Sequence, residues 1–364
     1  MAFIEKRKNG RYRARYRGPD GRERSRTFDR KLDANAWVTS QEAAGDRGEW
    51  TDPTLGNTPF AEWAARFQEG RVHLRESTRA RDQTLMDRLV LPNFGDFRLA
   101  SVRPADVQGW VSNLVSRGYA ASTVRKAYQL AAGVFRSAVN SDVIRRSPCR
   151  NIDLPRAEQV EMRFLDPTEL QTLADAHEPR FRALVLTAGY TGLRWGELAA
   201  LAPDDFNLLR RTVTVSKSLS EVKGVLTVTA PKTKAARRTV AIPSTIADLI
   251  GAHLGTFPSQ GPVFSASDGG PLRRTNFRLR RWLPAVRDSV GEPCRFHDLR
   301  HSHVALLIGA GEHPKTIASR LGHTSVRTVL DVYGHLFDGL DEAAAERLDA
   351  IVSDHLAASP RPVA

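Results

Sequence analysis

Arginine occupies every second position from Arg11 to Arg17, and this alternation limits the fold of the chain more than any other feature. Successive side chains of a strand point to opposite faces, so the four arginines share one face while Tyr12, Ala14 and Tyr16 share the other. Turn-forming residues flank the stretch on both sides. The pattern therefore predicts a strand with one cationic face and one face that can pack.

The next stretch, residues 22–28, alternates again and predicts a second strand with Arg24 and Arg26 pointing outward. A helical pattern follows at 32–44, so we expect a small three-stranded sheet braced by one helix. Such an arginine face could enter a DNA groove as β-ribbon proteins do. The alternative is a solvated basic face without a ligand.

The basic charge is concentrated near the N-terminus. Twelve Lys and Arg stand against three acids between Lys6 and Lys31, while the whole chain of 364 residues has 54 Lys and Arg, 41 Asp and Glu and a net charge of +13. An excess of this size favours a polyanionic partner, of which nucleic acid is the commonest. A basic surface that only maintains solubility is the competing explanation.

The middle of the chain has the pattern of an all-helical domain, with apolar stripes at the spacing of a packed core. Thr58 is predicted to cap the first helix, with Pro59 in its first turn. Arg125 and Lys126 are candidates to face a phosphate backbone, although their spacing alone does not show it. The predicted helices lie at about 59–69, 78–90, 104–116 and 122–140.

The last segment mixes helices and strands. Asp166 and Glu169 form a capping-box pattern at the start of its first helix. β-branched alternation predicts three short antiparallel strands, at 212–216, 225–229 and 238–242. The helices are expected near 167–177, 181–190, 244–254, 275–288, 298–309, 314–321, 325–333 and 341–354.

The predicted fold class is multidomain and mainly α with small β-sheets: an N-terminal three-stranded β-sheet plus helix, a helical domain, and a mixed α+β domain. Cys149 and Cys294 have no CxxC spacing and are expected to be free thiols in a reducing cytoplasm. We find no apolar run long enough to span a membrane and no signal peptide, so a cytoplasmic protein is expected. The predicted boundaries are 1–56, 57–150, a linker at 151–162, and 163–364.

Several polar residues of the last segment stand in apolar surroundings, and each has an ordinary structural explanation. An arginine beside glycines usually caps a helix, and a tyrosine near a helix end is usually half-buried with its hydroxyl in water. His297 and His301 could be two zinc ligands on one helical face, completed by another histidine, although no HExxH pattern is present and Arg300 would crowd the ion.

Taken in chain order, however, these residues resemble the tyrosine recombinase (phage integrase) family, whose signature is Arg, Lys, His-x-x-Arg, His and Tyr. The matching motifs are TGLRWGEL at 191–198, PKTK at 231–234, HDLRHS at 297–302, LGH at 321–323 and YGH at 333–335. The resemblance covers about 163–355 strongly. It implies an arm-type DNA-binding domain at 1–56, a core-binding domain at 57–150 and a tyrosine-recombinase catalytic domain at 163–364.

The resemblance implies a site-specific recombinase that cuts and rejoins DNA through a covalent 3′-phosphotyrosyl intermediate, integrating and excising a phage or other mobile element. Arg194 and Arg300 would hold the non-bridging oxygens of the phosphate, which suits permanently charged guanidinium groups. Tyr333 would be the nucleophile, with His297 as acceptor or relay of its proton. The remaining catalytic candidates are Lys232 as general acid (with Lys234 competing for that role), His323 as a hydrogen-bond donor, and Glu197 in support of the basic side chains.

Rejoining the strand uses the energy stored in the phosphotyrosyl bond, so we expect no cofactor, neither ATP nor a metal ion. The expected partners are double-stranded DNA attachment sites, three further copies of the chain in a homotetramer, a host DNA-bending protein and an excisionase, with the protein nucleoid-associated when bound. The alternative functions are a catalytically inactive DNA-binding regulator and an enzyme similar to type IB topoisomerases. The predicted DNA-binding residues are Arg11, Arg13, Arg15, Arg17, Arg24, Arg26, Arg125 and Lys126.

Overall fold

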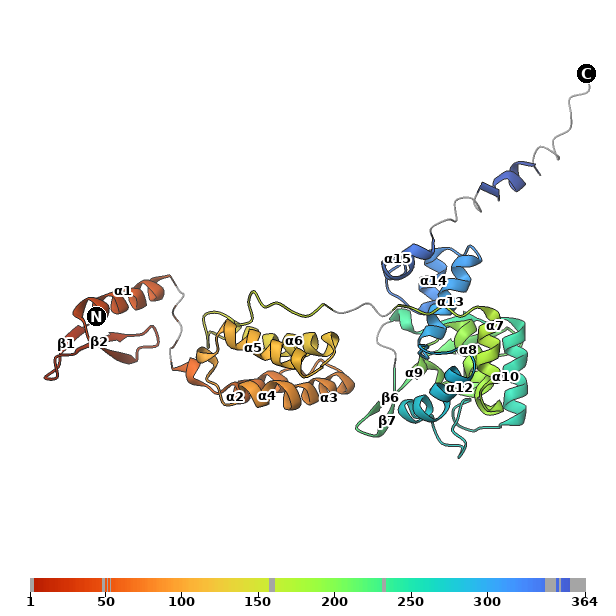
Figure 1. Ribbon diagram of the computed structural model, residues 1–364, viewed down its shortest axis with the longest axis horizontal. Coiled ribbons are helices and arrows are strands. Elements are labelled where there is room, and N and C mark those ends of the chain that lie inside the picture. Colours follow the sequence, from red (N-terminus) through yellow and green to blue (C-terminus); the bar gives the residue numbers. More distant parts are fainter. Residues whose placement is uncertain are drawn as a thin grey trace, which may run out of the picture. The chain divides into compact units, whose positions relative to one another are not determined.

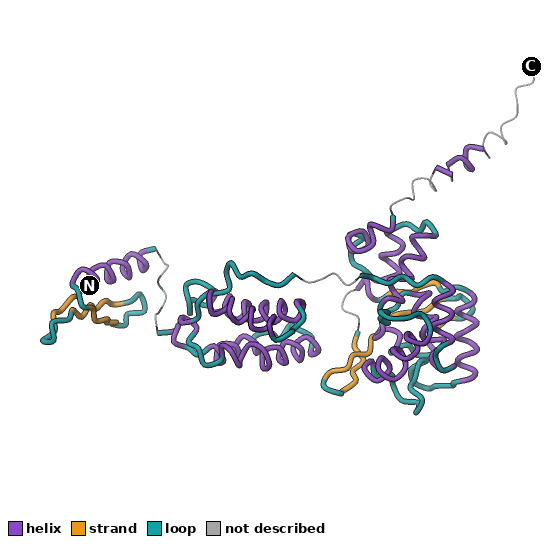
Figure 2. The backbone as a smooth tube through the Cα atoms, viewed as in Figure 1, coloured by secondary structure: helices purple, strands orange, loops and turns teal. Residues whose placement is uncertain are grey.

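A computed structural model of the chain separates into two compact units, Met1–Gln159 and Val160–Ala364 (Figure 1). The residues that it describes are 3–47, 50, 52, 54–156, 161–230, 234–337, 345–346 and 348–353. Helices prevail and the sheets are small and antiparallel, as Figure 2 shows by colour. The predicted fold class is confirmed.

The first unit begins with the predicted three-stranded sheet. Strands β1 (Phe3–Lys6), β2 (Tyr12–Arg17) and β3 (Glu23–Phe28) pair in that order, and helix α1 (Lys31–Asp46) packs on one face. Ala14 and Tyr16 are buried on that face, while Arg13, Arg15 and Arg17 alternate with them. The alternation of β2 is therefore the one predicted.

Arg24 and Arg26 do not join this arginine face. Directly paired residues of antiparallel strands point to the same side, and Arg24 pairs with Tyr16 while Arg26 pairs with Ala14. Both side chains therefore leave the sheet on the side of α1. The prediction that Arg24 points outward is wrong: its guanidinium is largely buried, pairs with Asp20 and Asp52, and lies 4.7 Å from the Trp50 ring centroid.

The second part of this unit is the predicted helical domain. Its helices are α2 (Phe60–Glu69), α3 (Glu76–Leu85), a π-helical turn at Met86–Val90, α4 (Leu91–Phe94), α5 (Pro104–Ser116) and α6 (Ala121–Asn140). Thr58 is not the N-cap of α2, because Pro59 holds that position and the Thr58 hydroxyl donates to the Leu55 carbonyl at 2.8 Å.

Part of the predicted linker lies against these helices. Gln108 exchanges hydrogen bonds with the backbone of Asp153, and Arg125 donates to the Pro155 carbonyl at 3.0 Å. Ile152 and Leu154 pack on the helical core. Residues 151–155 therefore extend this domain.

The second unit places helices around a central apolar helix, α8, whose residues are buried along most of its length. The capping box of Asp166 and Glu169 is confirmed at the start of α7. The helices are α7 (Pro167–Asp175), α8 (Pro179–Thr191), α9 (Trp195–Leu198), α10 (Ser244–Thr256), α11 (Arg274–Phe277), a π-helical turn at Arg278–Trp282, α12 (Leu283–Asp288), α13 (Asp298–Gly309), α14 (Pro314–Leu321) and α15 (Arg327–Tyr333).

The strands of this unit form two sheets, where one set of three strands was predicted. Strands β4 (Phe206–Asn207), β5 (Thr212–Val215) and β8 (Arg238–Ala241) form one, in that order, and β6 (Ser218–Val222) pairs with β7 (Val225–Thr229) as a separate hairpin. The prediction missed β6 because its sequence, SLSEV, carries few β-branched residues. The partner of β7 is therefore β6.

Three further expectations concern the chain as a whole. Cys149 and Cys294 are free cysteines. No helix among the described residues is long and apolar enough to cross a membrane. Of the helix predicted at 341–354, residues 345–346 and 348–353 are helical and the others lie outside the described residues.

Candidate active site

Arg300 is a buried arginine whose guanidinium is held by the ends of two helices. It lies in the first turn of α13 with 3% of its surface exposed, and it donates to the Gly192 carbonyl at 2.5 Å and to the Leu321 carbonyl at 2.8 Å. The last carbonyls of a helix have no partner within it and form the negative end of its dipole, so they suit a guanidinium.

Two glycines make these helix ends possible. Gly192 and Gly322 cap α8 and α14 in the left-handed region, with φ of 65° and 67°. A Cβ on Gly192 would lie 2.6 Å from a ring carbon of the buried His303, and one on Gly322 would lie 3.0 Å from a guanidinium nitrogen of Arg238. The motifs TGLR and LGH therefore need glycine because the backbone is left-handed there and a Cβ would meet close neighbours.

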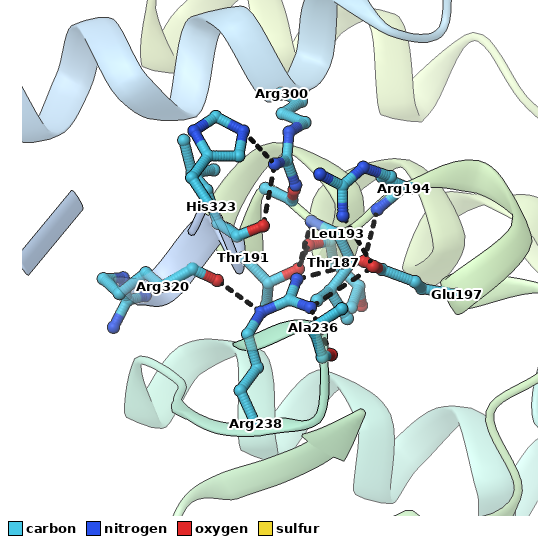
Figure 3. Close-up of polar contacts among 12 residues, drawn as sticks. Thr187, Thr191, Leu193, Arg194, Glu197, Ala236, Arg238, Arg300, Arg320 and His323 are labelled. Carbon is cyan, nitrogen blue, oxygen red and sulfur yellow. Dashed lines mark hydrogen bonds and ion pairs between the residues drawn. The ribbon is translucent and has the colours of Figure 1, made fainter. Parts of the chain in front are cut away.

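Arg194 reaches the same region from the N-terminus of α9. Its Nη1 pairs with the Glu197 carboxylate at 2.9 Å, and Glu197 also accepts from the Arg194 backbone. Arg238 approaches that carboxylate from the other side at 3.0 Å, as Figure 3 shows. Burial would raise the pKa of Glu197, but the hydrogen bonds and charges of the two arginines lower it, so the group is a carboxylate at pH 7.

Arg238 is a site residue that the sequence analysis missed. Besides Glu197, its Nε donates to the Arg320 carbonyl near the end of α14 at 2.6 Å, and its side chain is 7% exposed. It therefore joins β8 and α9 to the helix that precedes His323 (Figure 3). This role cannot be read from the basic stretch around Arg238, because Glu197 and Arg320 lie at least 41 positions away in the chain.

His323 contacts Arg300 directly, with 3.1 Å between its Nε2 and Nη2 of the guanidinium. Burial and the charges of Arg300 and Arg194 lower the pKa of His323 to about 4, so the ring is neutral at pH 7. Because the arginine must donate, Nε2 accepts and the proton stands on Nδ1, which has no partner among the described residues. This Nδ1 donor is buried and unpaired in the described structure.

Tyr333, the last residue of α15, is 3% exposed and packs in a small apolar cluster with α13 and α14. Burial raises the pKa of its phenol, and the charge of Arg300 acts in the opposite direction. Its hydroxyl lies 2.8 Å from Nδ1 of His301. The structure thus brings the predicted nucleophile and Arg300 together, with a histidine that the sequence analysis assigned only as a possible zinc ligand.

His297 precedes α13 and is more exposed than His301. The two rings meet edge to face, with centroids 5.0 Å apart. Loss of hydration, His301 and the charges of Arg300 and Arg194 lower the pKa of His297, which favours the neutral ring. His297 and Arg194 also line a hollow of about 650 Å³ whose far wall is the β6–β7 hairpin.

The remaining predicted residues are the lysines of the PKTK motif and the two basic residues of α6. Lys232 lies outside the described residues, and Lys234 begins a short 3-10 turn, Lys234–Ala236. Lys126 is exposed on α6, whereas Arg125 is half-buried and bonded to Pro155. No group of three or more metal-binding side chains is found among the residues that the structure describes.

The arrangement is suited to hold a tetrahedral anion. Three of the five N–H donors of Arg300 are used by Gly192, Leu321 and His323, and the other two have no partner in the part of the chain that the structure describes. Burial and the neighbouring Arg194 lower the pKa of Arg300 to about 9, so it remains protonated at pH 7. A negatively charged ligand would relieve this concentration of positive charge.

Family models match the chain in three places. The phage integrase family model covers residues 163–339, the phage integrase N-terminal domain covers 3–47, and the phage integrase N-terminal SAM-like domain covers 60–115. The order along the chain is that of the three folded parts described above.

Individual relatives agree with these matches. The chain is 31% identical over 359 residues to a protein of Mycobacterium tuberculosis named as the integrase of prophage phiRv2, covering 95% of this chain and 94% of the relative. It is 32% identical over 260 residues to the ICEBs1 integrase of Bacillus subtilis, covering 68% and 70%. The integrase of Mycobacterium phage L5 is 27% identical over 365 residues, covering 96% and 97%.

Two solved structures have a similar fold. The Tn1549 transposon integrase in complex with transposon DNA aligns with a TM-score of 0.69 at 20% identity, over 79% of this chain and 98% of that one. A lambda integrase dimer bound to a core site aligns with a TM-score of 0.61 at 16% identity, over 92% and 94%. Together with the family models and the relatives along nearly its full length, these matches show that the chain belongs to the phage integrase family of tyrosine recombinases.

Proposed function

We propose that this chain is a site-specific DNA recombinase, an integrase, that breaks and rejoins DNA strands through Tyr333. The observation that carries the proposal is a buried, protonated Arg300 whose charge acts on the phenol of Tyr333 and which has two donors without a partner among the described residues. Arg194 supplies a second guanidinium from α9, held by Glu197. Two guanidiniums and a phenol in one site suit attack on a phosphodiester.

The attack makes a pentacoordinate phosphorus with additional negative charge on its oxygens. Arg194 and Arg300 would bind the non-bridging oxygens, and His323 would donate a hydrogen bond to the same phosphate. Loss of one such donor typically costs 10²–10³ in rate. Lys232 would protonate the leaving 5′ oxygen, leaving the 3′ phosphate on Tyr333. A second 5′ hydroxyl then reverses the reaction without ATP.

The DNA partners would be attachment sites of a phage or other mobile element. Lambda integrase has been solved as a dimer on a core site and as a tetramer on a Holliday junction. For this chain we propose the same tetrameric assembly, with four copies on two duplexes. The assembly would act on the nucleoid in the cytoplasm. A host DNA-bending protein and an excisionase would complete the reaction in its two directions.

The arginine face of β2 would bind the flanking arm-type DNA, and the helical domain, with Lys126 exposed on α6, would bind the core site. The proposed domains are 1–56 for the arm, 57–150 for the core site and 163–364 for catalysis. Deletion of 1–56 should abolish binding to distal arm DNA and leave core-site binding intact.

Replacement of Tyr333 tests the proposal. A nicked suicide substrate traps the covalent adduct. Cleavage releases a short DNA fragment that carries the 5′ hydroxyl, and rejoining is prevented because this fragment diffuses away. Tyr333→Phe should bind DNA as the wild type does in a gel shift and should form no adduct on a denaturing gel. Tyr190→Phe, a half-buried tyrosine of the same unit, is the matched control and should form adducts normally. Adducts that survive in Tyr333→Phe would contradict the assignment.

A further inference from the structure

Within the described residues, Tyr333 shares a hydrogen bond with His301, the residue after Arg300. Nδ1 of His301 lies 2.8 Å from the phenolic oxygen, and the ring centroids are 5.7 Å apart. His301 is half-buried on α13 and Tyr333 is buried at the end of α15. The contact therefore joins two helices that are 32 positions apart in the chain.

We propose that His301 is a catalytic residue that takes the proton of Tyr333 as the phenol attacks the phosphate. This inference rests on the proposed function of the same site. The family resemblance implies the role of acceptor or relay for His297; the contact assigns the first transfer to His301. His297, with its ring 5.0 Å from that of His301, remains the candidate for a following position in the relay.

The charges around His301 favour its neutral form. Burial lowers its pKa; Asp298 on the same helix raises it, and Arg295 and Arg300 lower it, with a net decrease. Among the described residues, His297, which precedes α13, and Tyr333 at the end of α15 also face it with their rings. A neutral ring with its proton on Nε2 can accept at Nδ1, which is the atom that contacts the phenol.

The proposed step moves the phenol proton and exchanges one phosphorus–oxygen bond for another. The O–H bond of Tyr333 breaks, its proton moves to Nδ1 of His301, and the phenolic oxygen forms a bond to phosphorus. The bond from phosphorus to the 5′ oxygen breaks, and that oxygen takes a proton from the general acid. In the rejoining step the imidazolium returns its proton to the phenolate, so His301 is restored.

His301→Asn is the decisive variant, because the Asn amide can keep a hydrogen bond but cannot accept a proton. Positioned proton transfer contributes typically 10²–10⁴-fold, so cleavage of the suicide substrate should slow by roughly 10²-fold or more. His313→Asn is the matched control, since His313 is exposed, caps α14 with its side chain, and Asn is a good N-cap. It should cleave at the wild-type rate.

A fluorinated tyrosine at position 333 separates proton transfer from structural damage. Its more acidic phenol needs less help from a base, so the loss in His301→Asn should shrink at least tenfold. A merely structural role for His301 predicts the same loss with both phenols, and that result would overturn the inference. Wild-type cleavage by His301→Asn with the ordinary tyrosine would overturn it as well.

The pH profile of the wild-type protein gives a measurement that needs no variant. With a neutral histidine as base, the cleavage rate should fall as pH drops through the lowered pKa of His301 and should be level from pH 7 to 8, below the pKa of about 9 of Arg300. Without a base it should rise about tenfold over the same pH unit, because burial holds the pKa of the Tyr333 phenol above its ordinary value of about 10. That rise in the wild type would contradict the inference, whether or not His301→Asn folds.

The two proposals fail separately. Adducts in Tyr333→Phe would remove the nucleophile and with it the proposed function. If Tyr333→Phe forms no adduct while His301→Asn cleaves normally, the recombinase stands and only the role of His301 is lost.

Discussion

At the scale of single residues, the site depends on a buried carboxylate between two arginines. Glu197 and Arg238 are each 7% exposed in their side chains and lie 3.0 Å apart, whereas Arg194 is 41% exposed. Arg238 therefore compensates the buried charge of Glu197, and Arg194 stays accessible to a ligand. A positioning role for Arg238 follows, because it touches Glu197 and the end of α14 and has no contact with Tyr333 among the described residues.

Arg238→Ala should destabilise the protein and weaken catalysis together. Removal of one partner of a buried ion pair leaves the other charge uncompensated and costs about 3–5 kcal/mol. We expect that decrease in the free energy of unfolding of this unit in urea, and a lower cleavage rate at saturating DNA. Arg287→Ala, which removes an ion pair exposed by 71% and 61%, should leave the free energy of unfolding essentially unchanged. Equal effects of the two variants would contradict the role of Arg238.

Single residues were predictable where a local motif marks them. Arg194, Arg300, His323 and Tyr333 stand beside glycines or in the HDLR motif, and the described structure brings these four into one region. His301 and Arg238 depend on partners 32 and 41 or more positions away. Their roles follow from the packing of α13 against α15 and of β8 against α9, which periodicity does not determine.

At the scale of elements, the glycine ends of α8 and α14 set the position of Arg300. Each helix stops in a left-handed residue and presents a carbonyl to the guanidinium, at Gly192 and Leu321. The arginine is thus fixed by backbone atoms, which move less than side chains. Its orientation should depend on the two caps.

Gly192→Ala tests this dependence. A left-handed Ala costs roughly 1–2 kcal/mol, and contact with His303 adds an overpacking cost of about 1–3 kcal/mol. We expect unfolding in urea at correspondingly lower concentration and adduct formation at least tenfold slower. Gly309→Ala on α13, where a Cβ would meet nothing within 4 Å, should be neutral or slightly stabilising. If Gly192→Ala changed neither stability nor the rate of adduct formation, the cap of α8 would not determine the orientation of Arg300.

Most helices were predictable from apolar periodicity, and the exceptions have local causes. The pattern at 78–90 continues through a π-helical turn into α4, and a second π-helical turn precedes α12. In both places a Leu-Pro pair follows, and proline lacks the N–H that an α-helix needs and crowds the preceding turn. The β6–β7 hairpin was not predicted, because the register and the partner of a polar strand depend on tertiary contacts.

At the scale of the whole molecule, charge and domain order were predictable and the faces of the first sheet were only partly so. Alternation in β2 gives the arginine face correctly, but the register of β3 relative to β2 decides where Arg24 and Arg26 point. A shift of one residue exchanges the faces of a strand, and no feature of 22–28 determines that register. The buried pairing of Arg24 with Asp20 and Asp52 accordingly depends on the fold.

The corrected faces make a prediction about DNA affinity. Each phosphate contact contributes about 0.9 to the slope of log K against log salt, so replacing Arg13, Arg15 and Arg17 by Ala should reduce that slope by about 3 on arm-type DNA. Arg15 is paired with Glu5 and Glu23 at 3.3 and 3.5 Å, but such half-exposed pairs are weak enough for phosphate to compete. Arg26→Gln on the opposite side should leave the slope unchanged. Fluorescence anisotropy between 50 and 200 mM salt measures both; a decrease of about 0.9 in Arg26→Gln, with no change in the triple variant, would place DNA on the side of α1 instead.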